Sequence, residues 1–204
     1  MKCCMLSDAS MSCGDHMQAM VLTGGRSTRM GQDKSTLSIN GRTLIEITLG
    51  RLLAAGHSRI VVLAADEQQK KSQKDALSGF SYDIEWVLDP IPHEGLIEAL
   101  VSGANRSNFD RTLPLQLSPV DYPWLSETIY PVLQEALLRN VEVVTPADQR
   151  QHPLHSLVRS PSVLETLSPY KGPLIEQLGE LKSVTVPWPS SELVNVNAPS
   201  DIEG

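Results

Sequence analysis

A glycine-rich loop with clustered positive charge is the segment of this sequence best suited to bind phosphate. Residues 22–34 read Leu-Thr-Gly-Gly-Arg-Ser-Thr-Arg-Met-Gly-Gln-Asp-Lys. Glycines let the backbone approach a ligand closely, and successive amide N–H groups can form an anion-binding nest. The segment from Val21 to Arg42 holds four cations and one acid, a local charge of +3 in a chain whose net charge is -7. These charged residues are Arg26, Arg29, Lys34 and Arg42 against Asp33. We therefore expect a phosphate site here.

The loop matches neither of the two common phosphate-binding fingerprints. In a P-loop a lysine directly follows the second glycine, whereas two residues separate Gly31 from Lys34 here. The dinucleotide fingerprint needs G-x-G-x-x-G, which Gly24-Gly25 followed by Gly31 does not supply. A surface turn with solvated cations would explain an isolated glycine pair, but it does not explain the whole string.

Acidic and polar residues follow later predicted strands. Asp121 stands in Ser-Pro-Val-Asp-Tyr-Pro directly after one strand, and Asp89 ends another. Carboxylate oxygens are the ligands that Mg2+ prefers, although an isolated aspartate at such a place is usually a turn former or a cap. Asn197 either contacts metal or substrate or caps a final helix that begins at Pro199. His152 lies on a loop, where a lone histidine is usually incidental.

Alternating strands and helices must position these residues. Buried strands are predicted at 19–23, 59–64, 82–88, 112–117 and 141–145, and short extended segments at 155–158, 182–186 and 193–196. Helices are predicted at 43–55, at 66–74 as a solvated helix, on the stripe of Leu96, Leu100 and Val101, and at 129–137 and 174–181. The alternation implies right-handed crossovers. We predict an α/β fold, a single-domain three-layer sandwich with a mostly parallel, Rossmann-like central sheet.

Composition narrows the class of protein. The chain has 204 residues, of which 41% are hydrophobic and 20% charged, so one domain with a real core is expected. An acidic chain of pI near 5.2 is a poor non-specific nucleic-acid binder. No apolar run approaches the roughly 20 residues that span a bilayer. We therefore expect neither nucleic acid nor a membrane as a partner.

The first residues are predicted to form a flexible leader, 1–17, before a single folded domain at 18–204. The leader contains all three cysteines, Cys3, Cys4 and Cys13, and lacks the continuous apolar segment of a secretory signal. This excludes a disulfide-stapled fold and favours a reducing cytoplasm. A metal site formed by the thiols and His16 matches no common ligand spacing.

The string at 22–34 closely resembles the signature of the molybdenum cofactor guanylyltransferase-like nucleotidyltransferases, whose loop reads L-A-G-G-x-S-x-R-M-G-x-D-K. The resemblance extends from about Met20 to Ile202. It implies that the nucleotide is held by Leu22, Thr23, Gly24 and Gly25. It also implies that Arg29 and Lys34 are catalytic, binding the triphosphate and neutralising charge on the α-phosphate and the departing pyrophosphate.

The same resemblance assigns roles to the later residues. A similar P-x-D-x-P-F/Y segment in the family carries the metal-binding aspartate, which implies that Asp121 is catalytic, holds Mg2+ and contacts the nucleotide. Asp89 stands where the family has an aspartate on the nucleotide. On the acceptor side, His152-Pro153-Leu154 resembles a lining segment, and Asn195 and Asn197 resemble the family's N-x-N-T-P ending.

The implied reaction transfers GMP from GTP to the phosphate of a molybdopterin cofactor and releases pyrophosphate. Three departures surround the implied base and acceptor: Glu94 and Glu98 replace glycines, and Leu63 stands where guanylate-transferring members tend to have asparagine. The pair Gly24-Gly25 mildly favours guanine over cytosine. A cytidylyltransferase on the same cofactor, another NTP transferase and a catalytically inactive nucleotide-binding relative remain alternatives, and the oligomeric state stays open.

Overall fold

A computed structural model describes residues 17–23, 33–90, 95–197 and 201. The predictions for Gly24, Gly25, Arg29, Glu94 and residues 1–16 of the leader lie outside the described residues. The first strand begins at Met17, two residues before the strand start that the sequence pattern indicates.

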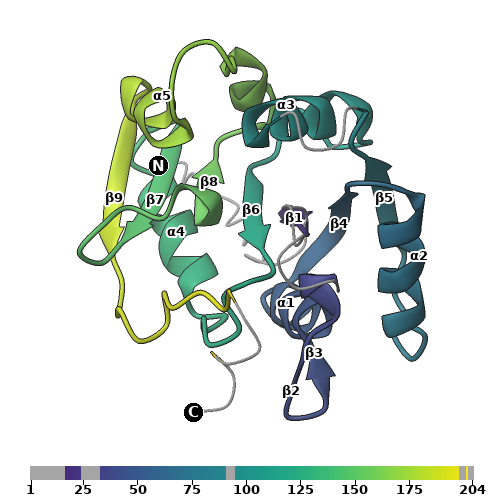
Figure 1. The fold of residues 1–204 in the computed structure, drawn as a ribbon. Coiled ribbons are helices and arrows are strands. Elements are labelled where there is room, and N and C mark those ends of the chain that lie inside the picture. Colours follow the sequence, from purple (N-terminus) through teal and green to yellow (C-terminus); the bar gives the residue numbers. More distant parts are fainter. Residues whose placement is uncertain (1–16, 24–32, 91–94, 198–200, 202–204) are drawn as a thin grey trace, which may run out of the picture.

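A seven-stranded sheet forms the centre of the molecule, with strand order β5-β4-β1-β6-β8-β7-β9 (Figure 1). The strands are β1 (Met17–Leu22), β4 (His57–Ala64), β5 (Ile84–Leu88), β6 (Leu115–Pro119), β7 (Val143–Ala147), β8 (Leu157–Val158) and β9 (Ser183–Pro187). Only β8 runs against its neighbours, β6 and β7, and every other pair in this sheet is parallel. The predicted mostly parallel α/β sheet is confirmed.

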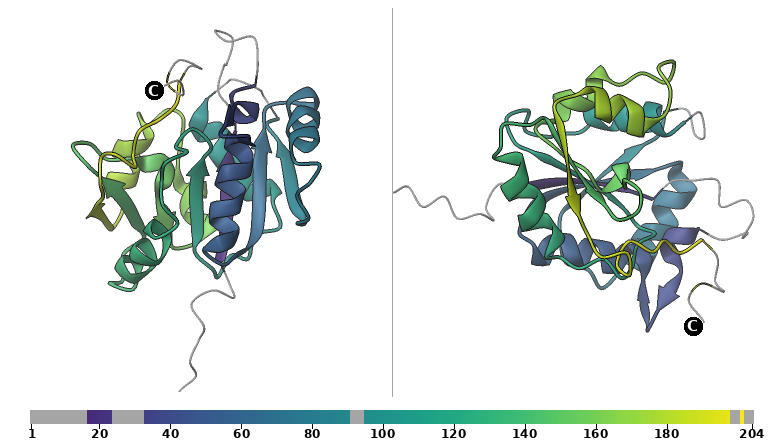
Figure 2. Two further views of the ribbon diagram at one scale, coloured as in Figure 1. Left: turned by 90° about the horizontal axis from the view of Figure 1, so that it is seen from below. Right: turned by 90° about the vertical axis from the view of Figure 1, so that its left-hand side faces the viewer.

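Helices cover both faces of the sheet, as Figure 2 shows. They are α1 (Leu44–Ala54), α2 (Glu67–Ala76), α3 (Leu96–Arg106), α4 (Ile129–Leu137) and α5 (Leu174–Glu180), with the 3-10 turns η2 (Lys34–Thr36), η3 (Pro153–His155) and η4 (Pro161–Thr166). Ala19 and Val21 of β1 pack in one core with α1 and α4, whereas Met20 and Leu22 pack in another with α3, η4 and α5. The sheet lies between two layers of helices, with one apolar core on each of its faces, so the three predicted layers are present. Because β1 packs against both cores, it is apolar at nearly every position.

Local sequence signals set the boundaries of α1. A two-stranded hairpin, β2 (Ser38–Ile39) and β3 (Arg42–Thr43), turns at Asn40 and Gly41, whose φ angles are 52° and 79°. Thr43 then forms a capping box with Glu46, each side chain satisfying a backbone N–H of the first turn. Gly56 follows the helix with φ 88°, a conformation that favours glycine, so the predicted stop is confirmed.

Several predicted segments differ in extent. β6 begins at Leu115 because Pro114 has no N–H for the ladder and the preceding residues form a turn, in which Thr112 donates to Asp110 through both its N–H and its hydroxyl. β5 and β7 each begin two residues later than predicted. The stretch 193–196 forms no strand, but the Val196 N–H donates to the Asp121 carbonyl at 2.8 Å.

Within the described parts of the chain, none of the helices has both the length and the apolar character needed to cross a bilayer.

Candidate active site

The carboxyl ends of six of the seven strands lie along one edge of the sheet, since β9 pairs in parallel with β7. β5, β4, β1 and β6 are mutually parallel, and β7 runs in the same direction because two antiparallel pairings with β8 separate it from β6. Asp89, Thr23, Asp121 and Asp148 therefore all lie at this edge. In open α/β sheets ligands bind in the crevice outside the carboxyl ends of the strands.

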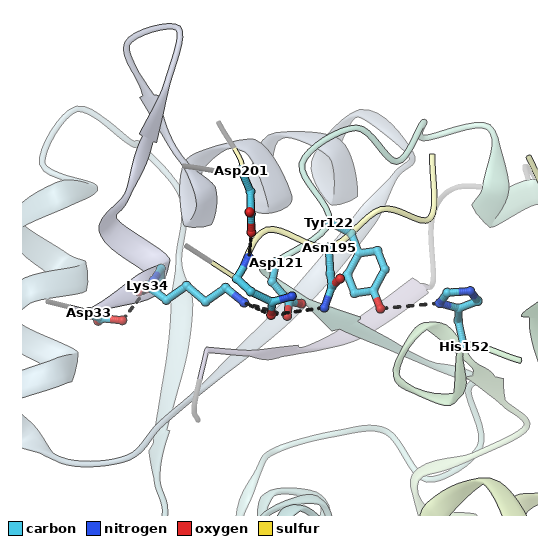
Figure 3. A network of polar contacts seen from close by, with 9 residues as sticks. Asp33, Lys34, Asp121, Tyr122, His152, Asn195 and Asp201 are labelled. Atoms are coloured by element: carbon cyan, nitrogen blue, oxygen red, sulfur yellow. Dashed lines mark hydrogen bonds and ion pairs between the residues drawn. The ribbon is translucent and has the colours of Figure 1, made fainter. Parts of the chain in front are cut away.

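Three segments that are far apart in the sequence meet at this edge (Figure 3). The Lys34 ammonium on η2 lies 3.1 Å from Asp121 Oδ2 and also donates to Asn197 Oδ1 at 3.3 Å. Asn195 Nδ2 donates to the same Asn197 oxygen at 3.3 Å, while the Asn197 N–H donates to Asp201 at 2.7 Å. A cation, a carboxylate and two amides from three distant segments of the chain thus share one polar cluster.

A buried arginine holds the loop that carries Asp121. The guanidinium of Arg51, on α1, is 6% exposed and donates from Nη1 to the carbonyls of Tyr122 at 2.9 Å and Leu125 at 2.8 Å. Its Nε donates to the Tyr130 hydroxyl at 3.2 Å. These bonds fix the backbone immediately after Asp121. The sequence carried a signal for this role, because Arg51 lies on the buried face of an amphipathic helix, seven residues after Leu44.

A relay of polar groups connects Tyr122 to the neighbouring strand β7. The Tyr122 hydroxyl lies 3.5 Å from Nδ1 of His152 (Figure 3). Nε2 of the same ring lies 3.0 Å from Asp148 Oδ1. Burial and the negative charge of Asp121 raise the pKa of Tyr122, so the hydroxyl keeps its proton and donates to Nδ1. The backbone N–H of Arg150 and the His152 ring lower the pKa of Asp148 to about 2, which leaves an ionised carboxylate to accept from Nε2–H. His152 is 4% exposed, so its ring is packed within the protein and does not project into solvent as a free loop side chain.

The described residues of the predicted nucleotide loop make internal contacts. The Leu22 side chain is buried and its carbonyl accepts the Val120 N–H at 3.2 Å. Thr23 donates its hydroxyl to the Leu63 carbonyl at 2.6 Å. Both residues therefore join the end of β1 to its two neighbouring strands, the place from which the loop starts.

Asp89 lies apart from the Lys34–Asp121 contact. It follows β5, and its N–H donates to the Ala64 carbonyl at 2.9 Å. Three strand spacings separate β5 from β6, which is about 14 Å along the edge. The structure therefore brings Lys34, Asp121, Asn195 and Asn197 together, with His152 reached through Tyr122, but leaves Asp89 at a distance.

Two of the residues that depart from the family pattern, Leu63 and Glu98, lie in the described part of the structure with defined neighbours. Leu63 is 7% exposed in the core under α3, where a Cβ at Gly103 would stand 2.8 Å from its methyl groups. It offers no polar side-chain group to a base. Glu98 folds its carboxylate over Gly95, whose φ of 152° favours glycine.

The donor atoms at Asp121 suit a hard divalent cation. Carboxylate and amide oxygens are present, and in the described residues no group of three or more His, Cys, Asp or Glu side chains could hold a metal ion by itself. Mg2+ is usually held by one or two carboxylates together with substrate phosphates and water. The Asp121 carboxylate, with the Asn197 amide oxygen close by, is compatible with that mode of binding.

Comparison with known proteins identifies the family. The family described as "MobA-like NTP transferase domain" matches residues 19–181. The chain belongs to this family. A probable molybdenum cofactor guanylyltransferase of Mycobacterium bovis is 31% identical over 153 residues, 71% of this chain and 68% of the relative. Another from Peptoclostridium acidaminophilum is 43% identical over 65 residues, 30% of this chain and 29% of the relative. This member of the MobA-like family is a nucleotidyltransferase, and the resemblance seen in its sequence is confirmed.

Solved structures with this fold include proteins named for a guanine and for a cytidyl product. Molybdopterin-guanine dinucleotide biosynthesis protein A of Archaeoglobus fulgidus aligns with a TM-score of 0.69 at 20% identity, over 92% of this chain and 95% of that one. The 4-diphosphocytidyl-2C-methyl-D-erythritol synthase of Anaerococcus prevotii aligns with a TM-score of 0.73 at 16% identity, over 93% and 94%. At such identities the likeness establishes the fold alone.

Proposed function

We propose that this chain transfers GMP from GTP to the phosphate of a molybdopterin-type acceptor and releases pyrophosphate. The observation that carries the proposal is the 3.1 Å contact between Lys34 and Asp121 at the carboxyl edge of the sheet. A triphosphate needs a cation, and the metal that accompanies it needs a carboxylate. The names of the curated relatives support the acceptor and the guanine base.

The chemistry proposed is an in-line displacement. A phosphate oxygen of the acceptor attacks the α-phosphorus, and the bond from that phosphorus to the oxygen bridging to the β-phosphate breaks as pyrophosphate leaves. Lys34 and Arg29 neutralise negative charge on the phosphates, so that catalysis is mostly positioning and electrostatics. Mg2+ held by Asp121, with Asn197 beside it, would supply further charge neutralisation at the phosphates.

The order of residues along the edge supports a proposed direction for the two substrates. Thr23 and Asp89 lie on one side of Asp121, and His152 and Asp148 lie on the other. We place the nucleoside toward Asp89 and the acceptor toward His152, with the reacting phosphates between them at Asp121. The predicted contacts of Leu22, Thr23, Gly24 and Gly25 belong to the nucleotide side of this arrangement, and the predicted contact of Asn195 belongs to the acceptor side. We propose the cytoplasm as the compartment of the reaction.

A nucleotide panel tests the proposal. Pyrophosphate release is measured with GTP, CTP, ATP or UTP, Mg2+ and molybdopterin, in the unmodified chain and in Lys34→Ala. We expect turnover with GTP that falls at least about a hundredfold in Lys34→Ala, as expected for loss of one charge-stabilising group. Lys171→Ala, which removes an exposed lysine outside the site, is the matched control. Equal rates in the two variants would contradict the role of Lys34.

Cytidylyl transfer is the second candidate, favoured by the buried, apolar Leu63 where guanylate-transferring members tend to have asparagine. The same panel separates the two, because a higher kcat/KM with CTP than with GTP would replace the guanylyl assignment. Binding of GTP and Mg2+ without pyrophosphate release would identify an inactive nucleotide-binding relative.

A further inference from the structure

Helix α2 contains one residue that contradicts its prediction as a solvated helix. Gln73 is fully buried, although the rest of α2 is rich in charged and exposed residues. Its Nε2 donates to Asp33 Oδ2 at 3.0 Å and lies 2.9 Å from Ser35 Oγ. Asp33 and Ser35 flank Lys34, so the Gln73 amide forms hydrogen bonds with the residues on both sides of this lysine.

The orientation of this amide follows from its partner. An ionised carboxylate only accepts hydrogen bonds, so the NH2 group of Gln73 has to face Asp33. Its Oε1 is buried and has no hydrogen-bond partner among the described residues. A buried amide with an unsatisfied oxygen is unfavourable for stability, whereas an apolar side chain of the same shape would avoid that loss. The contact is therefore better explained by what it does to the turn.

Gln69, one helical turn earlier, binds the ends of two strands to the same turn. Its Oε1 accepts the Ala65 N–H after β4 at 2.6 Å. Its Nε2 lies 3.4 Å from the Thr23 carbonyl after β1 and 3.3 Å from Asp33 Oδ1. The helix thus joins the start and the end of the segment that carries the predicted phosphate-binding residues.

Asp33 connects both glutamines to the turn η2 through its own hydrogen bonds. Its Oδ1 accepts the Ser35 N–H at 3.0 Å as the N-cap of the turn, and its carbonyl accepts the Thr36 hydroxyl at 2.8 Å. The backbone of Lys34 is consequently fixed relative to the strand ends, and only its side chain has to span the distance to Asp121. A small movement of the turn would shift the ammonium away from the phosphates.

We propose that Gln69 and Gln73 are positioning residues for Lys34, through which α2 sets where the ammonium stands against the triphosphate. The inference rests on the proposed function and deepens it, since it proposes that α2 determines the position of the Lys34 ammonium that binds the nucleotide. Neither glutamine contacts Asp121, Asn195 or Asn197 among the described residues. Both are therefore expected to act on the nucleotide and not on the acceptor.

The sharpest test reverses one hydrogen bond. Gln73→Glu places a carboxylate against that of Asp33, and we expect kcat/KM for the NTP to fall at least tenfold. In the double variant Asp33→Asn/Gln73→Glu the new amide can donate to the new carboxylate, while the remaining oxygen still accepts the Ser35 N–H. We expect the double variant to recover most of the lost activity. Gln68→Glu, an exposed position in the same helix with the same change of charge, is the matched control and should keep the unmodified rate.

A second variant keeps the inference testable if Gln73→Glu does not fold. In Gln69→Met, which removes the bonds to Thr23 and Asp33, we expect the KM for the NTP to rise about fivefold and the KM for the acceptor to stay within twofold. Circular dichroism and urea unfolding are used to check whether each variant is folded.

The outcomes separate the inference from the proposed function. Loss in the two glutamine variants, an unchanged Gln68→Glu and rescue by the double variant support the inference. Rates in Gln73→Glu and Gln69→Met equal to that of Gln68→Glu, in a chain that turns over NTP, overturn it while leaving the proposed function in place. An unmodified chain that neither binds nor turns over any NTP overturns the proposed function, and the inference with it.

Discussion

The two sides of the Lys34–Asp121 contact are built differently. Lys34 stands on a short turn that is held mainly by side chains of a polar helix, through Asp33. Asp121 stands on a loop whose backbone carbonyls accept from the buried Arg51 and from the Val196 N–H. One side is fixed by a few polar side chains, among them the buried Gln73, and the other is tied into the hydrophobic core between the sheet and α1.

This difference predicts which kind of change each side tolerates. On the Lys34 side, loss of a hydrogen bond moves a charge but disturbs little packing. On the Asp121 side, loss of the guanidinium leaves buried carbonyls without donors, which is costly for the whole domain. Loss of a charged group at the contact should therefore lower activity, whereas loss of the Arg51 support should lower stability, and four measurements can test that separation.

Asp121→Asn should have the largest effect, and on activity alone. It removes a charge at the phosphates, so kcat should fall by about a hundredfold to a thousandfold. The ion pair with Lys34 is partly solvated, with side chains 18% and 26% exposed, so the free energy of unfolding should change by less than about 1 kcal/mol. Pyrophosphate release and urea unfolding check the two numbers, with exposed Asp75→Asn as the control. A large loss of stability would show that the pair is structural.

Arg51→Met should do the opposite. It leaves the carbonyls of Tyr122 and Leu125 without their buried donor, so the free energy of unfolding should fall by about 2–4 kcal/mol. Urea unfolding measures this, and Gln73→Met should lose clearly less by the same measure. Equal losses in the two variants would remove the contrast between the two sides.

Acid should weaken the Asp121 side. Burial lowers the pKa of His57 from 6.5 to about 4, and its ring packs on Tyr130, which binds Arg51. The unfolded chain therefore binds more protons than the folded one between these values, and stability falls as the pH falls through that window, by at most about 3 kcal/mol. Burial also lowers the pKa of His155, which adds loss in the same direction. Urea unfolding at pH 7, 5.5 and 4 measures the slope, which His57→Gln should reduce; an unchanged slope would contradict the assignment.

His152→Asn should have the smallest effect of the four changes, and it should alter the KM for only one of the two substrates. The substitution breaks the relay from Tyr122 to Asp148, at the end of the edge where we place the acceptor. We expect the KM for the acceptor to rise about threefold to tenfold, the range for a single hydrogen bond of about 1 kcal/mol, with the KM for GTP unchanged. Steady-state kinetics with each substrate varied in turn decide this, and a rise in both KM values would place His152 outside the acceptor side.

Local patterns predicted most of the elements. The apolar runs of β1 and β4, the capping residues of α1 and the glycine that ends it lie next to the segments they define, so each could be recognised in a short window. Boundaries were less accurate where tertiary pairing decides them, as at the start of β6. The stretch 193–196 looked extended in sequence but pairs with a loop rather than with a strand.

The sequence by itself determined the family and the acid at the strand end and predicted the phosphate-binding character of the loop, because these depend on residue types at short, fixed spacings. Only the tertiary structure brought Lys34 to Asp121 and Asn197, which are 87 and 163 residues away. It alone showed that Gln69 and Gln73 hold the lysine turn. Glutamine and arginine are common on exposed helix faces, and only the packing of one element against another decides which of them point inward and what they bind.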